Sequence, residues 1–328
     1  MSSHACQRAS ALATKGAIAE GYQLLQQAAA GGDGYAAALL ADWRLAGQFI
    51  RRDLGEARRL YGLAWQLGIT GAAAPHIALL ASGAGGCGRD WQAAMQRLRQ
   101  VSMADAPAAM QLSLLAAMPL SDEGRPTQSF TREFLAGEPQ IEQFPGFLTS
   151  AECEYLCRIA VPALSPALVV DPRTGAMRPD PVRIARTAAF PFIAEDPVLH
   201  AINQRIAAAT GTLWEQGEPA QVIAYRAGEE YRLHSDALPG DTNQRVITFL
   251  VALNDSYEGG ATSFPAIGLN WRGRTGDALM FRNVGADGSS DPAARHAGNP
   301  IRKGTKFILS RWIRARPLDL AGPPGRPF

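Results

Sequence analysis

The sequence changes character near residue 120. Residues 1–118 are rich in alanine, whereas after Pro139 short runs of Val, Ile, Phe and Tyr are separated by Gly, Pro, Asn and Asp. The first pattern indicates helices and the second indicates strands. Residues 119–138 lose the apolar periodicity and carry Pro, Gly, Ser and charge, which predicts a linker. The sequence therefore predicts an α+β chain with a helical domain at 1–118, a linker at 119–138 and a second domain at 139–328.

The helical part contains internal echoes. Residues 28–32 are echoed at 64–68, and residues 52–57 at 89–94, a spacing of 36 to 37 residues. A fixed period of this size is typical of helix–turn–helix repeats. We expect one helix around residues 38–40 and the next over 54–68. The echoes resemble short Sel-like, tetratricopeptide-type repeats in about two and a half copies; the alternative is a plain alanine-rich helical domain with accidental echoes.

The second part is expected to combine helices with several strands. Helices are predicted at 150–160 and 196–210, and strands at 220–226, 245–253, 277–283 and 306–314. Helices followed by many short strands indicate a sandwich or a double-sheet jelly roll backed by helices.

Bulk composition excludes several classes of protein. The chain of 328 residues has 32 basic and 30 acidic side chains, so its charge gives no reason to expect nucleic acid or an anionic membrane as partner. No signal-peptide pattern and no run of 18 apolar residues occurs. Four cysteines are too few for a disulfide framework, and Cys153 and Cys157 are expected to be reduced thiols. A cytoplasmic protein with no membrane segment is the prediction.

His234 and Asp236 form a His-x-Asp pair in a segment expected to be extended. Side chains alternate along a strand, so both would point to one face. Two such ligands, together with a third from elsewhere, make the 2-His-1-carboxylate triad typical of non-haem iron(II) sites. The pair alone is a weak signal, because short motifs also occur by chance.

Two later residues strengthen this interpretation. His296 follows Asp236, and Lys306 begins a predicted strand on which Lys306, Ile308, Ser310 and Trp312 share one face. A cation that faces an apolar interior is costly unless it is paired, and the distal carboxylate of 2-oxoglutarate would be such a partner. The alternatives are an exposed lysine at a strand end and a loop histidine bonded to backbone.

Residues 140–316 resemble the prolyl-4-hydroxylase-like family of Fe(II)- and 2-oxoglutarate-dependent dioxygenases. The matching blocks follow the family's order: 143–153, 225–236, 244–254, 258–265, 276–281 and 296–312. The resemblance implies a double-stranded β-helix (jelly roll), Fe(II), 2-oxoglutarate and O2 as cofactor and cosubstrates, and ascorbate as an optional addition.

The resemblance also implies roles for individual residues. Iron and catalysis fall to His234, Asp236 and His296. The 2-oxoglutarate contacts fall to Lys306, Tyr225 and Thr248. The primary substrate would meet Tyr231, Arg245 and Trp312. The retained Asp236 favours hydroxylation over halogenation.

Two departures from the family pattern bear on the substrate. Residues 183–187 match an Arg-Thr-Ser strand except that Ala188 replaces the serine, so they receive no role. The loop 237–244 is short, which puts a broad peptide groove in doubt. We expect a hydroxylase of a prolyl residue in a peptide or protein, with the helical repeats recruiting a protein partner. The alternatives are a hydroxylase of a free amino acid or small metabolite, and a repeat-based scaffold with a silent oxygenase fold.

Overall fold

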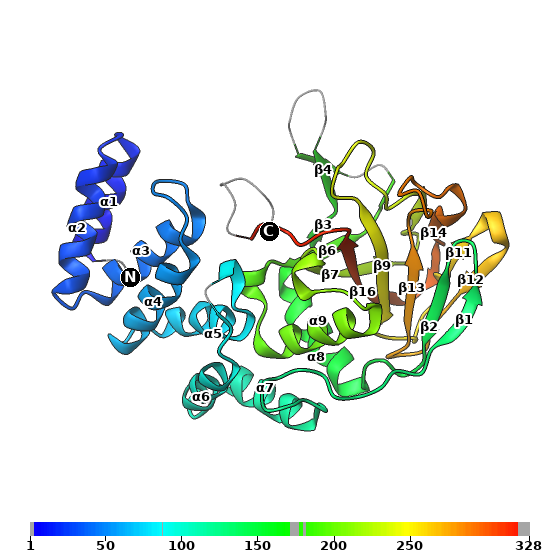
Figure 1. Cartoon of the computed structure of the whole chain (residues 1–328), viewed down its shortest axis with the longest axis horizontal. Coiled ribbons are helices and arrows are strands. Elements are labelled where there is room, and N and C mark those ends of the chain that lie inside the picture. Colours follow the sequence, from blue (N-terminus) through cyan, green and yellow to red (C-terminus); the bar gives the residue numbers. More distant parts are fainter. Residues whose placement is uncertain (1–2, 87, 171–176, 180–181, 321–328) are drawn as a thin grey trace. The chain divides into compact units, whose positions relative to one another are not determined.

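The computed structural model describes residues 3–86, 88–170, 177–179 and 182–320. The chain divides into two compact units (Figure 1). The first contains the described parts of 1–127, 191–202 and 319–328, and the second contains those of 128–190 and 203–318. The division after Thr127 lies inside the predicted linker, and the helical unit also includes two segments that were predicted to belong to the second domain.

The first unit is built from α-helices joined by short turns. They are α1 (His4–Thr14), α2 (Ile18–Ala30), α3 (Gly34–Ala46), α4 (Leu54–Gln66), α5 (Ala73–Ser82), α6 (Trp91–Ser102) and α7 (Ala106–Ala117), with 3-10 turns η1 (Thr70–Ala72) and η2 (Ala84–Gly86). Four of them, α3, α4, α6 and α7, begin after an aspartate whose carboxylate accepts a backbone N–H of the first turn. Such caps satisfy donors that the helix leaves free.

The similar segments 52–57 and 89–94 lie at the same place in two helical hairpins, at the starts of α4 and α6. Arg52 Nε donates to a carbonyl in the last turn of α3 at 2.7 Å, and Arg89 Nε does the same to α5 at 2.8 Å. Gly47 and Gly83 end these helices with φ of +66° and +65°. A Cβ at either glycine would lie within 3 Å of Arg52 or Arg89, so the close turn requires glycine. The assignment of these helices to Sel-like repeats stays a prediction.

The second unit contains a large antiparallel sheet with the order β1-β2-β13-β9-β16-β7-β6-β3. Its strands are β1 (Glu133–Ala136), β2 (Ile141–Phe144), β3 (Ser165–Pro166), β6 (Arg186–Phe190), β7 (Ala220–Arg226), β9 (Arg245–Ala252), β13 (Ala278–Arg282) and β16 (Thr305–Arg314). A second sheet has the order β12-β11-β14-β8. Its strands are β8 (Tyr231–His234), β11 (Thr262–Phe264), β12 (Leu269–Trp271) and β14 (His296–Gly298).

The remaining strands form two small pairs, and helices complete the unit. The pairs are β4 (Leu168–Val170) with β5 (Met177–Pro179), and β10 (Glu258–Gly259) with β15 (Ile301–Lys303). The helices are α8 (Ser150–Ala160) and the part of α9 (Pro197–Thr210) that begins at Asn203, with 3-10 turns η3 (Val161–Ala163), η5 (Trp214–Gln216), η6 (Pro265–Ile267) and η7 (Pro292–Ala294). The 3-10 turn η4 (Phe192–Ala194) and the start of α9 belong to the first unit. The six helices and strands predicted for this part agree with the observed ones to within one residue at each end. The predicted α+β class and jelly roll are confirmed.

One expectation about the linker was wrong. Residues 119–138 were predicted to be a connection, but Glu133–Ala136 is strand β1. It pairs with β2 at the edge of the large sheet, and its burial pattern lacks the alternation of a half-buried strand. Edge pairing is decided by the neighbouring strand rather than by local pattern, which is why no strand was predicted here.

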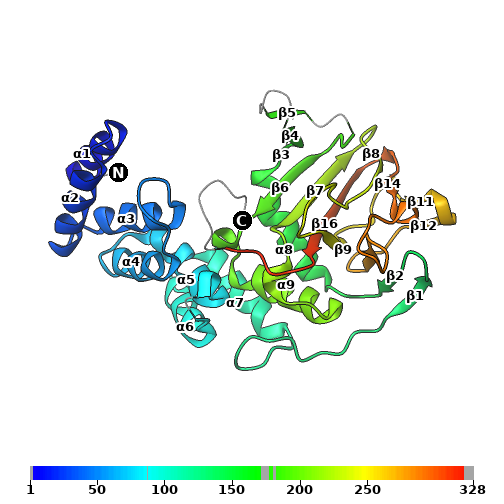
Figure 2. The ribbon, with the colours of Figure 1, turned by 45° about the horizontal axis from the view of Figure 1, so that its top comes forward.

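The core of the unit lies between the two sheets. It joins residues of β7, β9, β13 and β16 with residues of β11 and β12, among them the fully buried Phe264, Leu279 and Phe281. Figure 2 shows the strands of the second sheet beside those of the large one. Side chains on the inner face of β16 therefore point into a closed interior. No helix among the described residues is long and apolar enough to cross a membrane.

A buried ion pair holds the helices on the opposite face of the large sheet. Arg205 of α9 makes two hydrogen bonds to Glu152 of α8, at 3.0 and 2.7 Å, and a third to the carbonyl of Phe147. Both side chains are almost fully buried. Glu152 also accepts the backbone N–H of Thr149, completing the capping box that starts α8. The pair therefore fixes the start of α8 against α9.

We expect Arg205→Ala to lower the free energy of unfolding by about 3–5 kcal/mol, because it leaves a buried carboxylate without its cation. Urea denaturation followed by far-UV circular dichroism measures this. The double variant Arg205→Met with Glu152→Leu should recover much of the loss. An Arg205→Ala protein as stable as the unmodified one would contradict this account.

Candidate active site

Three side chains converge between the two sheets. His234 ends β8 and His296 begins β14, and the register of these strands places the two histidines directly opposite each other. Asp236 lies between them, with His234 Nε2 at 3.6 Å from Oδ1 and His296 Nε2 at 3.6 Å from Oδ2. One ligand atom from each residue lies within 4.8 Å of the others. Residues 60 positions apart in sequence thus meet at one point.

The local structure of the His-x-Asp pair differs from the expectation. Strand β8 ends at His234, so Asp236 lies beyond the strand rather than on it. Its side chain is nevertheless buried and faces the same point as His234. The strand alternation assumed from sequence therefore does not explain the convergence, and other contacts must hold Asp236.

The hydrogen bonds fix the proton positions on both imidazoles. His234 Nδ1 lies 2.8 Å from the carbonyl of Arg232, and His296 Nδ1 lies 3.1 Å from the carbonyl of Ala294. A carbonyl only accepts, so each Nδ1 carries the hydrogen and each Nε2 presents a lone pair. His234 Nε2 is buried without a hydrogen-bond partner in the described structure. Two imidazole nitrogens and one carboxylate oxygen fit a divalent iron ion.

Burial sets the charges of this cluster. It lowers the pKa of His296 to about 4, so this imidazole is neutral at physiological pH. Burial acts to raise the pKa of the Asp236 carboxyl, but His296, His234 and Thr248 act in the opposite direction and hold that pKa below its usual range. The cluster is therefore an ionised carboxylate beside a neutral His296, which is the protonation state that a metal requires of its ligands.

Aromatic rings pack around the two histidines. Tyr231 stacks on His234 with ring centroids 3.4 Å apart, and Phe281 meets His296 edge-on at 4.6 Å. Phe264 lies 5.5 Å from His296 on another side. These contacts restrict rotation of the rings and keep both Nε2 atoms aimed at Asp236.

The triad opens into a cavity whose far wall comes from β7 and β16. Its lining is Ile223, Tyr225, Tyr231, His234, Asp236, Leu250, Thr262, His296, Gly298, Lys306, Ile308, Ser310 and Trp312. Lys306, Ile308, Ser310 and Trp312 all line it, which confirms that they share the inner face of β16. Lys306 is 4% exposed, so the exposed strand-end alternative is excluded.

Lys306 is a buried cation without an anionic partner among the described residues. Its Nζ donates to the carbonyl of Gly260 at 2.7 Å. Gly260 has a φ of +66°, a backbone conformation that favours glycine, and this turn places its carbonyl against Lys306. Burial lowers the pKa of Lys306 to about 8, and the charge of Arg272 acts in the same direction. An anionic ligand in the cavity would supply the missing countercharge.

The hydroxyl groups are arranged differently from the expectation. Thr248, predicted to contact 2-oxoglutarate, is not among the lining residues; its hydroxyl donates to Asp236 Oδ2 at 2.6 Å. Thr262 and Ser310 do line the cavity and were not singled out as site residues. Ser310 had a usable signal, since it shares the β16 face with Lys306. Thr262 lies in the Glu-Gly-Gly-x-Thr turn, whose spatial place the sequence did not reveal.

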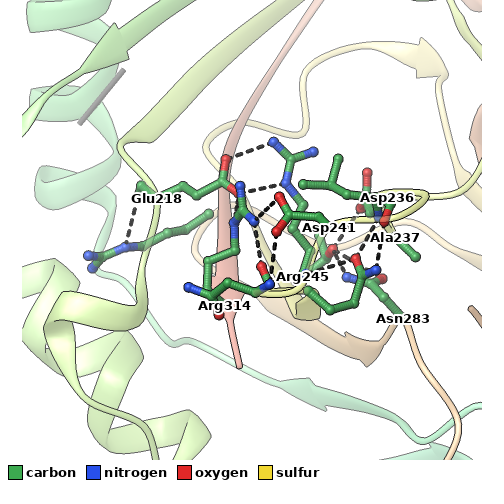
Figure 3. Close-up of polar contacts among 12 residues, drawn as sticks. Glu218, Asp236, Ala237, Asp241, Arg245, Asn283 and Arg314 are labelled. Atoms are coloured by element: carbon green, nitrogen blue, oxygen red, sulfur yellow. Dashed lines mark hydrogen bonds and ion pairs between the residues drawn. The ribbon is translucent and has the colours of Figure 1, made fainter. Parts of the chain in front are cut away.

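The predicted substrate residue Arg245 belongs to a charged cluster beside the cavity (Figure 3). Its guanidinium lies over the Trp312 ring at 3.9 Å and forms a two-point ion pair with Glu218 at 2.6 and 2.7 Å. Arg314 binds the same Glu218 oxygen at 2.5 Å and reaches Asp241 at 2.9 Å. Glu218 and Arg314 were missed from sequence, because neither belongs to a local motif.

Comparison with known proteins identifies the family of this chain. Residues 220–314 match the model of the 2OG-Fe(II) oxygenase superfamily. The chain is 33% identical over 205 residues to probable prolyl 4-hydroxylase 3 of Arabidopsis thaliana, covering 55% of this chain and 71% of that protein. It is also 33% identical over 195 residues to the rat prolyl 4-hydroxylase subunit alpha-1, covering 57% of this chain and 36% of that subunit. The chain belongs to the prolyl 4-hydroxylase family of 2OG-Fe(II) oxygenases.

Solved structures of the prolyl 4-hydroxylase family include similar chains. The viral collagen prolyl hydroxylase of Paramecium Bursaria Chlorella virus-1 is 25% identical and matches 54% of this chain and 96% of its own, with a TM-score of 0.44. A Pseudomonas putida prolyl-4-hydroxylase is 22% identical and matches 55% and 95%, with a TM-score of 0.41. The family membership confirms the predicted enzyme class: the protein is a 2-oxoglutarate-dependent dioxygenase that uses Fe(II), 2-oxoglutarate and O2.

We expect the affinity for 2-oxoglutarate to fall as pH rises through about 8, because Lys306 then loses its proton in the free protein. Below that pH the ammonium is present and affinity is full; above it, affinity should fall by up to about tenfold per pH unit. Isothermal titration at saturating Mn2+ between pH 6.5 and 9.5 measures this. Lys306→Arg keeps its charge over this pH range and should flatten the profile. If the variant shows the same pH dependence as the unmodified protein, the Lys306 ammonium does not bind 2-oxoglutarate.

Proposed function

We propose that this protein hydroxylates a prolyl residue in a peptide or protein, with Fe(II) held by His234, Asp236 and His296. The observation that carries the proposal is the meeting of two histidine Nε2 lone pairs and one carboxylate in a cavity that also contains a buried, uncompensated lysine. The relatives named above carry the name prolyl 4-hydroxylase, which supports proline as the substrate residue.

Lys306 would bind the distal carboxylate of 2-oxoglutarate. Tyr225 lies beside it, with Nζ 5.9 Å from the ring centroid, and Thr262 and Ser310 add hydroxyl groups to the same cavity. Ile223, Leu250 and Ile308 make the rest of this wall apolar. The apolar wall excludes water and strengthens the attraction between the ammonium and a carboxylate.

With iron and 2-oxoglutarate bound, such a site couples oxidative decarboxylation of 2-oxoglutarate to hydroxylation of a substrate C–H bond. The protein's own contribution is geometric. The carbonyls of Arg232 and Ala294 hold the imidazoles in the tautomer with a free Nε2. Tyr231 covers one face of His234 and limits access of water to that side.

The substrate would lie against Tyr231, Trp312 and Arg245. The indole Nε1 of Trp312 is buried without a hydrogen-bond partner in the described structure, so it can donate to a carbonyl. Glu218 holds the Arg245 guanidinium over the Trp312 ring and pairs with its charge. The uncharged indole N–H and the ion-paired guanidinium suit an uncharged peptide carbonyl better than a free carboxylate.

The composition of the cavity weighs against a free amino acid as substrate. Lys306 is the sole lysine or arginine among the described residues that line it. A free amino acid would need a cation for its carboxylate and would compete with 2-oxoglutarate for Lys306. Recruitment of a protein partner by the helical repeats, use of ascorbate and a cytoplasmic location stay predictions.

We expect His296→Ala and Asp236→Ala to abolish succinate formation from 2-oxoglutarate in the presence of a proline-containing peptide, since each removes a metal ligand. Succinate release and mass spectrometry of the peptide measure this, with free proline offered in parallel. The unmodified enzyme should add 16 Da to the peptide. Turnover of free proline with no peptide product would replace the proposed substrate by the small-molecule alternative.

We expect Glu218→Gln to raise the KM for the peptide about tenfold, on the order of 1.4 kcal/mol, because Arg245 loses its ionic partner and its fixed position over Trp312. The KM for 2-oxoglutarate should not change. Asp241→Asn is the matched control, since Asp241 contacts Arg314 rather than Arg245. An equal effect of both substitutions on the peptide KM would show that the cluster is structural only.

A further inference from the structure

Thr248 is the one residue predicted to contact 2-oxoglutarate that the structure places against the metal carboxylate instead. We propose that Thr248, oriented by Asn283, is a positioning residue that fixes the Asp236 carboxylate for metal binding. This inference rests on the proposed metal triad and adds to it. Figure 3 shows Asn283 beside Asp236.

The need for such a residue follows from the backbone. His234 and His296 lie on paired strands, so the sheet register holds them. Asp236 lies beyond the end of β8 and has no strand to fix it. Thr248 lies on β9, between β13 and β16 in the large sheet, with Phe281 and Trp312 as its register partners. The hydrogen bond from Thr248 on this central strand can therefore fix the Asp236 side chain, which β8 does not hold.

The direction of the hydrogen bonds can be worked out. A threonine hydroxyl has one proton, and its short 2.6 Å contact is to the charged Oδ2 of Asp236. The proton therefore goes to the carboxylate, and the hydroxyl oxygen must accept from its other neighbour. Asn283 Nδ2 lies 2.9 Å away and donates to it. The chain runs from the Asn283 amide to the Thr248 hydroxyl to the Asp236 carboxylate.

Asn283 is itself tightly held. Both it and Thr248 are 1% exposed. The backbone N–H of Asn283 donates to the backbone carbonyl of Val246 at 3.0 Å. The backbone carbonyl of Asn283 accepts from the backbone N–H of Asp291 at 3.0 Å. The second contact ties Asn283 to the segment that leads into His296. Asn283 thus contacts Thr248 through its side chain and the segment before His296 through its backbone.

The hydrogen bond also separates the two oxygens of Asp236. Oδ2 accepts the hydrogen bond from Thr248 and lies 3.6 Å from His296 Nε2, while Oδ1 lies 3.6 Å from His234 Nε2. The bond to Oδ2 stops the carboxylate from rotating, so each of its oxygens stays turned toward one histidine. Partners that orient metal ligands in this way typically change metal affinity by about 10–100-fold when removed.

The test compares Thr248→Val with Thr248→Ser in the full chain. Co2+ binding to the metal-free protein is followed by visible absorption, and the KM for 2-oxoglutarate is measured at saturating Fe(II). We expect Thr248→Val to weaken Co2+ binding about 10–100-fold and Thr248→Ser to stay within about threefold of the unmodified protein. Neither should change the KM for 2-oxoglutarate by more than about threefold, since neither removes a lining residue.

Thr262→Val is the matched control, because it removes a hydroxyl that does line the cavity. We expect the opposite result from it, with unchanged Co2+ affinity and a raised KM for 2-oxoglutarate. Unchanged Co2+ affinity with a raised KM in Thr248→Val would overturn the inference and restore Thr248 as a cosubstrate contact.

A second variant keeps the inference testable if Thr248→Val does not fold, as judged by its thermal unfolding midpoint. Asn283→Ala removes the amide that orients the hydroxyl and should weaken Co2+ binding about threefold or more. Unmodified affinity in this variant would overturn the inference. Failure of the proposed metal site looks different, because Co2+ would then not bind the unmodified protein, or would bind His296→Ala equally well.

Discussion

Everything at this site depends on keeping charged groups inside an apolar jelly roll. Asp236 and Lys306 are 5% and 4% exposed, and an isolated charge in such a place is strongly unfavourable. The carboxylate accepts a hydrogen bond from the Thr248 hydroxyl, whereas the ammonium donates to one carbonyl and has no anion beside it among the described residues. Two charges in the protein are therefore left for ligands to balance: a cation would balance Asp236, and an anion would balance Lys306. Both residues line the same cavity.

The large sheet supplies the rigid side of this arrangement. Its inner face presents Tyr225, Lys306, Ser310 and Trp312 in fixed register. The second sheet supplies the histidines through β8 and β14. Asp236 belongs to neither sheet, and the Thr248 hydroxyl joins it to the large one. The metal site is therefore assembled across the interface of the two sheets, which links metal binding to the packing of the fold.

The ion pairs around Glu218 position the arginine side chains beside the cavity. They place one carboxylate between Arg245 and Arg314 and so hold the Arg245 guanidinium over the ring of Trp312. Arg314 also bonds Asp241 and the carbonyl of Asn243, in the short loop that follows Asp236. Arg314 thus ties the loop that follows Asp236 to the end of β16. A short, anchored loop favours a narrow substrate contact over a broad groove.

The sequence by itself determined the elements and most of the chemistry. Periodicity located α8, β7, β9, β13 and β16 to within a residue, because a buried strand or an amphipathic helix must repeat its apolar pattern. The order of the motifs singled out His234, Asp236, His296 and Lys306, and the structure brings these four side chains to one cavity. Tertiary structure alone decided which way Thr248 points, that Thr262 lines the cavity, that Glu218 and Arg314 join Arg245, and that residues 133–136 form a strand. These features arise from contacts between segments far apart in the chain, and no local pattern carries the information about which distant partner a side chain meets.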